Sequence, residues 1–402
     1  MVEGLVERGM VRDPKVAAAL RAVPRHLFVP EAPLEEAYQD RAIPTKYRDG
    51  RPSSSASQPA IVARMLEQLQ VEPGQSVLEI GAGTGYNAAL LAHLVGQDGT
   101  VVTVDIDADT VEKARRHLAE AGLAGVQVAC GDGAGGWPEG APYDRIIVTA
   151  GASDLAPAWW DQLAPGGRLV LPLSLRGVQQ CVTFAWTDGH LESQSVCDCG
   201  FMPLQGMLAN TDVYHEIPDH PGVAIIAREG LGVNIGALST ALSQPRSRLE
   251  VGVGATPIEV LGSLRRWLAL HEPSAAQLTC CGRSDQVAAS PVPRLVELPL
   301  DQGRSHRGTV VVLGHSGLAA LDRNDSQPAN PDVETAIPLA ARCFGFAPGE
   351  AGRLVDLIQG WDEVGRPPTS ELHIAAYAAP DFSNLTEGIV ERTRHTTFVM
   401  TM

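Results

Sequence analysis

A glycine-rich turn between an apolar strand and a helix is the strongest chemical signal in this sequence. The strand predicted at Val77–Ile80 runs into the turn, and the helix predicted after it begins at Tyr86. Because glycine has no Cβ atom, such a turn lets the backbone approach a bound ligand closely. We expect the ligand to contact Glu79, Gly81, Gly83, Thr84 and Gly85.

Two carboxylates follow this turn, each at the end of a later strand. Asp105 ends the next predicted strand, about 20 residues on, where a carboxylate can accept hydrogen bonds from both hydroxyls of a ribose. Asp132, followed by Gly133, comes after the third strand and suits the amino group of an adenine. Each feature alone also occurs in ordinary turns and helix caps. The three in this order predict a cofactor that contains adenosine.

The charge at the end of the first strand favours S-adenosylmethionine (SAM) over a dinucleotide. Glu79 would repel a pyrophosphate, whereas it is acceptable beside the cationic methionine part of SAM. No Gly-Lys-Ser/Thr sequence follows the turn, which excludes a P-loop. We therefore predict an enzyme, a SAM-dependent methyltransferase.

The elements that must position these residues alternate between strand and helix over the first half of the chain. This alternation predicts parallel βαβ units and a Rossmann-like, doubly wound α/β domain over residues 1–208, with the ligand at the carboxyl ends of the strands. Further strands are expected at Val101–Val104, Val126–Ala129, Arg145–Thr149 and Arg168–Leu173.

Residues 209–402 show no second cofactor-like turn, and we expect them to form a C-terminal α+β domain. The element order is β-α-β-β-α-β, which is compatible with a ferredoxin-like fold. Gly282–Arg307 is expected to be a long loop. The predicted strands are Leu249–Val253, Gln277–Cys281, Thr309–Leu313 and Glu371–Tyr377, and the predicted helices are Pro257–His271 and Glu350–Trp361.

From about Val2 to Leu208 the sequence resembles the protein-L-isoaspartate (D-aspartate) O-methyltransferases. The resemblance implies methylation of a peptide carboxylate, with Ser57 at the position of the family's active-site hydroxyl. The motifs that carry it include Arg21–Pro30, Ser57-Gln58-Pro59, Gly131-Asp132-Gly133, Gly136-Trp137-Pro138 and Ile147-Val148-Thr149-Ala150.

Hydroxyl groups suit this chemistry. A carboxylate with a pKa of ~4 is already ionised at neutral pH, so the oxygen nucleophile needs no general base. The enzyme must mainly bring that oxygen in line with the sulfonium methyl group. Ser57 and Thr149 can orient a carboxylate without adding a competing nucleophilic nitrogen, and we predict them as the catalytic residues.

Two departures from the family favour one of its branches. The stretch Thr45–Ala56 is longer and more basic than usual, and Lys46, Arg48 and Arg51 are candidate contacts to an acidic peptide. The second departure is the extra half of the chain. Together they make the sequence similar to the branch associated with ribosomally synthesised, modified peptides such as lanthipeptides, graspetides and lasso peptides. There, methylation of an L-aspartate leads to a succinimide (aspartimide), which persists or hydrolyses to isoaspartate.

Two alternatives remain beside this reading. One is an isoaspartate repair enzyme with an additional domain. The other is a non-catalytic SAM-binding module that acts through protein interactions. If the chain matures a peptide, residues 209–402 are expected to recognise that substrate.

Composition narrows the partners further. The net charge of −16 disfavours nucleic acid, and no apolar run approaches the ~20 residues that a bilayer requires. The first residues do not resemble a secretion signal, and seven irregularly spaced cysteines fit a reducing, cytoplasmic setting. Cys197-Asp198-Cys199 and Cys280-Cys281 lack the spacing of a zinc site, so no metal is expected.

Overall fold

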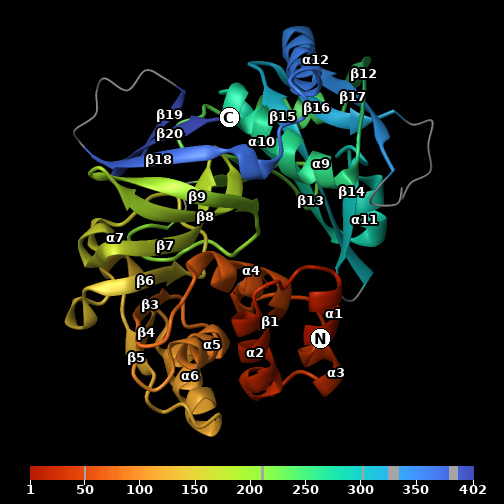
Figure 1. Ribbon diagram of the computed structural model, residues 1–402. Helices are drawn as coiled ribbons and strands as arrows, with labels where there is room; N and C mark the ends of the chain where they lie inside the picture. Colours follow the sequence, from red (N-terminus) through yellow and green to blue (C-terminus); the bar gives the residue numbers. More distant parts are fainter. Residues whose placement is uncertain (49–50, 210–211, 301–302, 325–334, 380–387) are drawn as a thin grey trace. The chain divides into compact units, whose positions relative to one another are not determined.

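The chain divides into two compact units (Figure 1). Unit 1 comprises residues 1–174, 179–210 and 372–402, and unit 2 comprises residues 175–178 and 211–371. The expected second domain, 209–402, is thus divided between the two units. The computed structural model describes all residues except 49–50, 210–211, 301–302, 325–334 and 380–387.

Unit 1 is built on a ten-stranded sheet with the order β19-β20-β18-β9-β8-β7-β6-β3-β4-β5. The strands from β7 to β5 pair in parallel, which confirms the predicted doubly wound fold. β8 and β9 pair antiparallel. The strands are β3 (Ser76–Ile80), β4 (Thr100–Asp105), β5 (Gln127–Cys130), β6 (Tyr143–Val148), β7 (Leu163–Leu175), β8 (Val178–Thr187) and β9 (His190–Asp198).

The helices of unit 1 begin at recognisable signals. Proline occupies the first turn of α2, α4 and α7, where its missing N–H costs no hydrogen bond. Asp107 caps α6 by accepting a hydrogen bond from the Thr110 N–H. The helices are α1 (Val2–Glu7), α2 (Pro14–Ala22), α3 (Leu34–Ala37), α4 (Pro59–Leu69), α5 (Tyr86–Val95), α6 (Ala108–Glu120) and α7 (Pro157–Gln162), and a hairpin of β1 (Ile43–Arg48) and β2 (Arg51–Ala56) precedes α4.

The last strands of the chain complete the sheet of unit 1. Strand β18 (His373–Ala378) lies beside β9, with Ala376 opposite Leu191, and β20 (Thr396–Thr401) and β19 (Ile389–Arg392) follow it (Figure 1). Ile374, Phe398 and Met400 are buried there. The strand predicted at Glu371–Tyr377 therefore forms, but in the methyltransferase sheet.

Unit 2 contains an eight-stranded sheet with the order β10-β11-β13-β15-β16-β17-β12, and β14 pairs with β15 beside this path. All of the recorded pairings are antiparallel. The strands are β10 (Val213–Glu216), β11 (Val223–Ala227), β12 (Pro245–Ala255), β13 (Ala275–Arg283), β14 (Val296–Leu300), β15 (Arg304–Leu313), β16 (Gly317–Arg323) and β17 (Ile337–Gly345).

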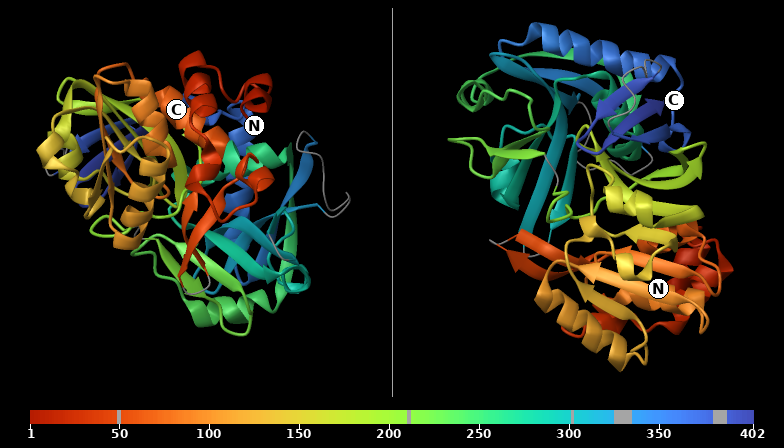
Figure 2. Two further views of the ribbon diagram at one scale, coloured as in Figure 1. Left: turned by 90° about the horizontal axis from the view of Figure 1, so that it is seen from below. Right: turned by 90° about the vertical axis from the view of Figure 1, so that its left-hand side faces the viewer.

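Helices cover both faces of this second sheet. α12 (Pro348–Glu363) lies against β12, β16 and β17 (Figure 2). Its side chains Leu354, Ile358 and Trp361 are buried in the core on this face of the sheet. α8 (Ile235–Leu242) packs on the other face. α9 (Pro257–Glu259) continues through a π-helical turn into α10 (Arg265–His271), and α11 (Ser284–Ala289) follows β13.

Two expectations about the second half were wrong. The ferredoxin-like arrangement does not form, because β18 joins unit 1 and the second sheet contains strands that the sequence did not reveal. The expected loop Gly282–Arg307 contains α11 and β14. β14 includes a proline, which a strand beside the main path of a sheet tolerates. No helix in the described ranges is both long and apolar enough to cross a bilayer.

Candidate functional site

A cavity of about 1040 Å³ lies at the carboxyl ends of β3, β4 and β6 in unit 1. It brings most of the predicted site residues together, in the place expected for a doubly wound sheet. Gly85 and Asp132 do not line it, and the side chain of Arg51 lies outside the described part of the chain. The predicted residues that line the cavity are Lys46, Arg48, Ser57, Glu79, Gly81, Gly83, Thr84, Asp105, Gly133 and Thr149.

The first glycine of the turn is held against the end of β6. Gly81 has a φ of +103°, and a Cβ atom there would lie 2.6 Å from the Thr149 hydroxyl oxygen. That hydroxyl donates to the Gly81 carbonyl at 2.7 Å, and the Thr149 N–H donates to the Ile80 carbonyl at 2.8 Å. Thr149 thus holds the glycine turn in place and also lines the cavity. That Thr149 orients a substrate carboxylate stays a prediction.

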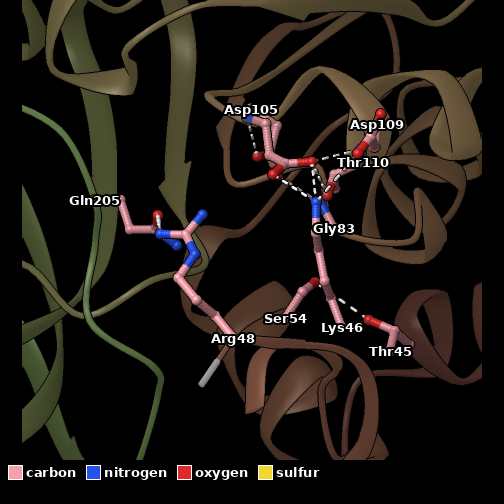
Figure 3. A network of polar contacts seen from close by, with 10 residues as sticks. Thr45, Lys46, Arg48, Ser54, Gly83, Asp105, Asp109, Thr110 and Gln205 are labelled. Carbon is pink, nitrogen blue, oxygen red and sulfur yellow. Dashed lines mark hydrogen bonds and ion pairs between the residues drawn. The ribbon is translucent and has the colours of Figure 1, made fainter. Parts of the chain in front are cut away.

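Asp105 holds the backbone of the glycine turn and also lines the cavity, where its carboxylate can accept hydrogen bonds from a ligand. Its carboxylate accepts a hydrogen bond from the Gly83 N–H at 3.1 Å (Figure 3). It accepts a second one from the Asp107 N–H, also at 3.1 Å. Burial raises the pKa of Asp105 above its usual range. An ionised carboxylate has about four lone-pair positions, so it can accept a further hydrogen bond from a ribose hydroxyl. The geometry is compatible with the predicted ribose contact.

Glu79 is fully buried between two neutral donors. Thr103 donates to one of its oxygens at 2.7 Å, and Asn87 donates to the other at 2.8 Å. Burial raises the pKa of Glu79 to about 7. Neither donor was singled out from the sequence, although Asn87 is a polar residue in the otherwise apolar first turns of α5 and gave a usable signal.

The titration of Glu79 predicts pH-dependent binding of SAM. A cation beside the cavity favours the ionised carboxylate, so cofactor binding must release the proton that Glu79 holds below pH 7. We expect the dissociation constant for SAM to fall about tenfold between pH 6 and pH 8. Titration calorimetry in buffers with different ionisation enthalpies measures the released proton. Glu79→Gln should flatten the dependence, whereas the exposed Glu112→Gln should preserve it. The same slope in Glu79→Gln would contradict this role.

Ser57 lies in the cavity wall immediately before α4, where Arg25 holds its backbone. The Arg25 guanidinium is buried, donates to the Ser57 carbonyl at 2.9 Å and lies 5.0 Å above the Tyr86 ring. Gln58 and Pro59 then start the helix. Arg25 belongs to the motif Arg21–Pro30 but was not predicted as a supporting residue, because its partners come from distant parts of the chain.

Substitution of Ser57 tests its assignment to the acceptor. Ser57→Ala should lower kcat about tenfold, or ~1.4 kcal/mol in the barrier, with SAM affinity unchanged, because the hydroxyl is assigned to the carboxylate and not to the cofactor. Steady-state kinetics at saturating SAM measure this change. Ser284→Ala, which removes a hydroxyl in unit 2 that donates to the Gly303 carbonyl, is the matched control. A kcat within about twofold of the parent would make Ser57 a loop residue only.

Lys46 and Arg48 of the β1–β2 hairpin have partners inside unit 1. The Lys46 ammonium lies 2.6 Å from Asp107 and 3.5 Å from Asp109, and its hydrogen bond lowers the pKa of Asp107 to about 2. Arg48 donates to the Gln205 side chain at 3.1 Å (Figure 3). These contacts fix the hairpin to two walls of the cavity. Contact of Lys46 or Arg48 with a peptide stays a prediction.

Two predicted cofactor residues have other surroundings. The Asp132 oxygens accept hydrogen bonds from the N–H groups of Ala134 at 2.9 Å and Met207 at 2.8 Å. Gly85 begins α5, where a Cβ atom would lie 3.3 Å from both the Ala114 carbonyl and Leu118 of α6. Gly85 thus permits close packing of two helices. A contact of Asp132 with adenine stays a prediction.

The segment after β9 forms a cavity wall that the sequence did not reveal. The Gly151 N–H donates to the Met202 carbonyl, and the Leu204 N–H donates to the Gly151 carbonyl, both at 2.8 Å. Pro203 pairs with Gly151 as an isolated bridge. The segment shows no regular alternation of apolar and polar residues that would predict a strand or a helix. It pairs with Gly151 after β6 on one side and lines the cavity on the other. The cavity is lined by Cys197, near the end of β9, and by Cys199, Met202, Pro203, Leu204 and Gln205 after it.

Comparisons with known proteins agree with this geometry. A family model described as protein-L-isoaspartate(D-aspartate) O-methyltransferase (PCMT) matches residues 1–209. The protein-L-isoaspartate O-methyltransferase of Hyperthermus butylicus is 42% identical over 215 residues, which cover 51% of this chain and 87% of the relative. The Methanopyrus kandleri enzyme of the same name is 43% identical over 208 residues, covering 51% and 90%.

A solved structure extends the likeness into the second half of the chain. It is named protein-L-isoaspartate O-methyltransferase, has a TM-score of 0.50 and 25% sequence identity, and the match covers 93% of this chain and 96% of that one. The structural match therefore extends over most of the additional half of this chain.

Proposed function

Because the chain belongs to the protein-L-isoaspartate (D-aspartate) O-methyltransferase family, we propose that its acceptor is the free α-carboxylate of an isoaspartyl residue in a protein or peptide. The chain is a SAM-dependent O-methyltransferase, and the proposal concerns what it methylates. In an isoaspartyl residue the side-chain carboxyl forms the peptide bond, so the α-carboxylate is the free one. The observation that supports the proposal is a single cavity lined by both Asp105 and Ser57.

The residues of the cavity supply what this reaction needs. SAM, when bound, supplies an electrophilic methyl group on a sulfonium. The proposal assigns to Ser57, which lines the cavity, a hydrogen bond to one carboxylate oxygen, and the other oxygen is then free to attack. The new O–C bond forms as the C–S bond breaks, giving a methyl ester and S-adenosylhomocysteine. Orientation dominates the catalysis, because the nucleophile is already ionised.

The grounds for the peptide-maturation branch are weaker with the structure and comparisons at hand. The extra half of the chain lies largely within the match to a solved structure named for the isoaspartate activity. Lys46 and Arg48 have partners within unit 1. Methylation of an L-aspartate in a modified precursor peptide, followed by succinimide formation, is therefore the second candidate. The non-catalytic alternative is set aside, because the chain is an enzyme of this family.

Recognition of the polypeptide is the role that we propose for unit 2. The sequence predicts this role for residues 209–402, but β18, β19 and β20 belong to the methyltransferase sheet. The proposed recognition region is therefore narrowed to residues 211–371. An aspartyl side chain offers little surface, and contacts remote from the methyl transfer can supply binding energy that orients it.

Methyl incorporation into three acceptors tests the proposal with the full chain. The acceptors are an isoaspartyl peptide, the L-aspartyl peptide of the same sequence and a conformationally constrained precursor peptide with L-aspartate. We expect kcat/KM for the isoaspartyl peptide to exceed the other two at least about tenfold, or ~1.4 kcal/mol. If the constrained L-aspartyl peptide is methylated faster than the isoaspartyl peptide, peptide maturation and not repair is the function of this enzyme. A reaction without enzyme gives the background.

A further inference from the structure

Two cysteines face each other across adjacent strands of unit 1. Cys181 of β8 is directly opposite Cys197 of β9, next to the pair Gln180–Asp198 at the open end of the hairpin. The register shift in this hairpin lies beyond them, between Thr183 and Phe184. Directly opposite residues of an antiparallel pair have their side chains on the same face and Cα atoms about 4.5–5.5 Å apart. This interval lies within the roughly 4.4–6.8 Å that a disulfide spans. The backbone therefore permits a bond between the two sulfurs.

The sulfurs share their surroundings. The Cys181 thiol donates to the Gln68 side-chain oxygen at 3.1 Å, and the Cys197 sulfur lies 4.0 Å from the same oxygen. The two thiols are also within hydrogen-bond reach of one another. Cys199, two residues on, instead lies 3.8 Å from Gln179, and burial raises the pKa of its thiol. The geometry thus pairs Cys197 with Cys181 and not with Cys199.

The two thiols differ in access and in charge. Cys197 lines the active-site cavity, whereas Cys181 is fully buried. Arg64 lines the same cavity, and its charge favours the thiolate of Cys197, whereas the hydrogen bond to Cys197 and burial raise the pKa of Cys181. The hydrogen bond from Cys181, assisted by Arg64, lowers the pKa of Cys197. An accessible thiolate next to a second thiol is the arrangement of an oxidisable pair.

We propose that Cys181 and Cys197 form an oxidisable dithiol in the wall of the active-site cavity, with a hydroperoxide as oxidant. The Cys197 thiolate attacks one oxygen of the hydroperoxide, the O–O bond breaks, and a sulfenic acid forms with release of an alcohol, or of water from hydrogen peroxide. The Cys181 sulfur then attacks the Cys197 sulfur. The S–O bond breaks, and the leaving hydroxide takes up the thiol proton as water. Two thiols and one hydroperoxide give one disulfide, one alcohol and one water.

The sequence allows the bond to be mapped without ambiguity. An endoproteinase that cleaves before aspartate cuts at Asp161, Asp188, Asp198 and Asp212, which separates Cys181, Cys197 and Cys199 into the fragments 161–187, 188–197 and 198–211. After treatment of the full-length enzyme with hydrogen peroxide and blocking of free thiols, fragments 161–187 and 188–197 should appear as one linked species. It should weigh two hydrogen atoms less than their sum, and dithiothreitol should restore both. Fragment 198–211 should carry the blocking group.

Variants separate this pairing from general oxidation. Cys181→Ser and Cys197→Ser should each abolish the linked species, whereas Cys280→Ser, at a buried strand cysteine of unit 2, should leave its yield unchanged. Arg64→Gln should slow its formation several-fold. Linkage of 188–197 to 198–211, or conversion of Cys197 to a sulfinic acid with Cys181 still blocked as a free thiol, would overturn the proposal. Both outcomes are read from the parent enzyme and do not depend on the folding of a variant.

Discussion

Phe398→Ala is expected to destabilise unit 1 by about 3–5 kcal/mol, although the residue lies almost at the end of the chain. Phe398 is 0% exposed in β20, where it pairs with Ala376 of β18 and Glu391 of β19. Through β18 these strands extend the sheet beyond β9. Loss of the ring leaves a cavity among buried side chains and weakens the cover of the β9 edge.

Thermal unfolding with and without S-adenosylhomocysteine measures this effect. A ligand stabilises only the unit that binds it, so the transition that the ligand raises belongs to unit 1. Phe398→Ala should lower that transition and leave the other unchanged. Phe346→Ala, at a 70% exposed phenylalanine of unit 2, removes the same ring at little cost. If the ligand-raised transition keeps its temperature in Phe398→Ala, the C-terminal strands do not stabilise the methyltransferase sheet.

The fold could be predicted where neighbouring strands are also neighbours in the sequence. The repeated strand–helix order identified the parallel half of unit 1, because each βαβ connection is local and of fixed handedness. It did not reveal that the strand beginning near His373 pairs with β9. The sequence of a short strand does not indicate which distant sheet edge it will pair with, since this pairing depends on the complementarity of the folded surfaces. β16, a short run buried at every position, gave no period by which to distinguish strand from helix.

The same distinction holds for the site. The glycine turn and Asp105 were predictable, because a strand end and the turn after it place them together. The partners of Glu79 were not, since Thr103 reaches it from the neighbouring strand and Asn87 from the following helix. Arg48 and Gln205 are far apart in sequence, and only the folded hairpin brings them into contact. Long-range polar contacts leave no periodic trace along the chain.

Asp105→Ala is expected to weaken the binding of SAM and S-adenosylhomocysteine by about 10- to 150-fold, equivalent to ~1.5–3 kcal/mol for charge-assisted hydrogen bonds. The loss has two sources. The ribose loses its predicted acceptor, and the Gly83 N–H loses the carboxylate that fixes the glycine turn. Both effects act on cofactor affinity, so kcat at saturating SAM should change less than KM for SAM.

Calorimetric titration with S-adenosylhomocysteine measures the affinity. Two further variants show how much of the loss comes from the charge of Asp105 and how much from its hydrogen bonds. Asp105→Asn keeps one oxygen to accept from a backbone N–H but lacks the charge, so its affinity should lie between that of the parent and that of Asp105→Ala. Asp98→Ala removes an exposed carboxylate from the loop before β4 and should bind like the parent. The unliganded thermal transition of each variant shows whether it is folded. Unchanged affinity in folded Asp105→Ala would remove this carboxylate from the cofactor site, whereas equal losses in Asp105→Asn and Asp105→Ala would assign the whole effect to charge.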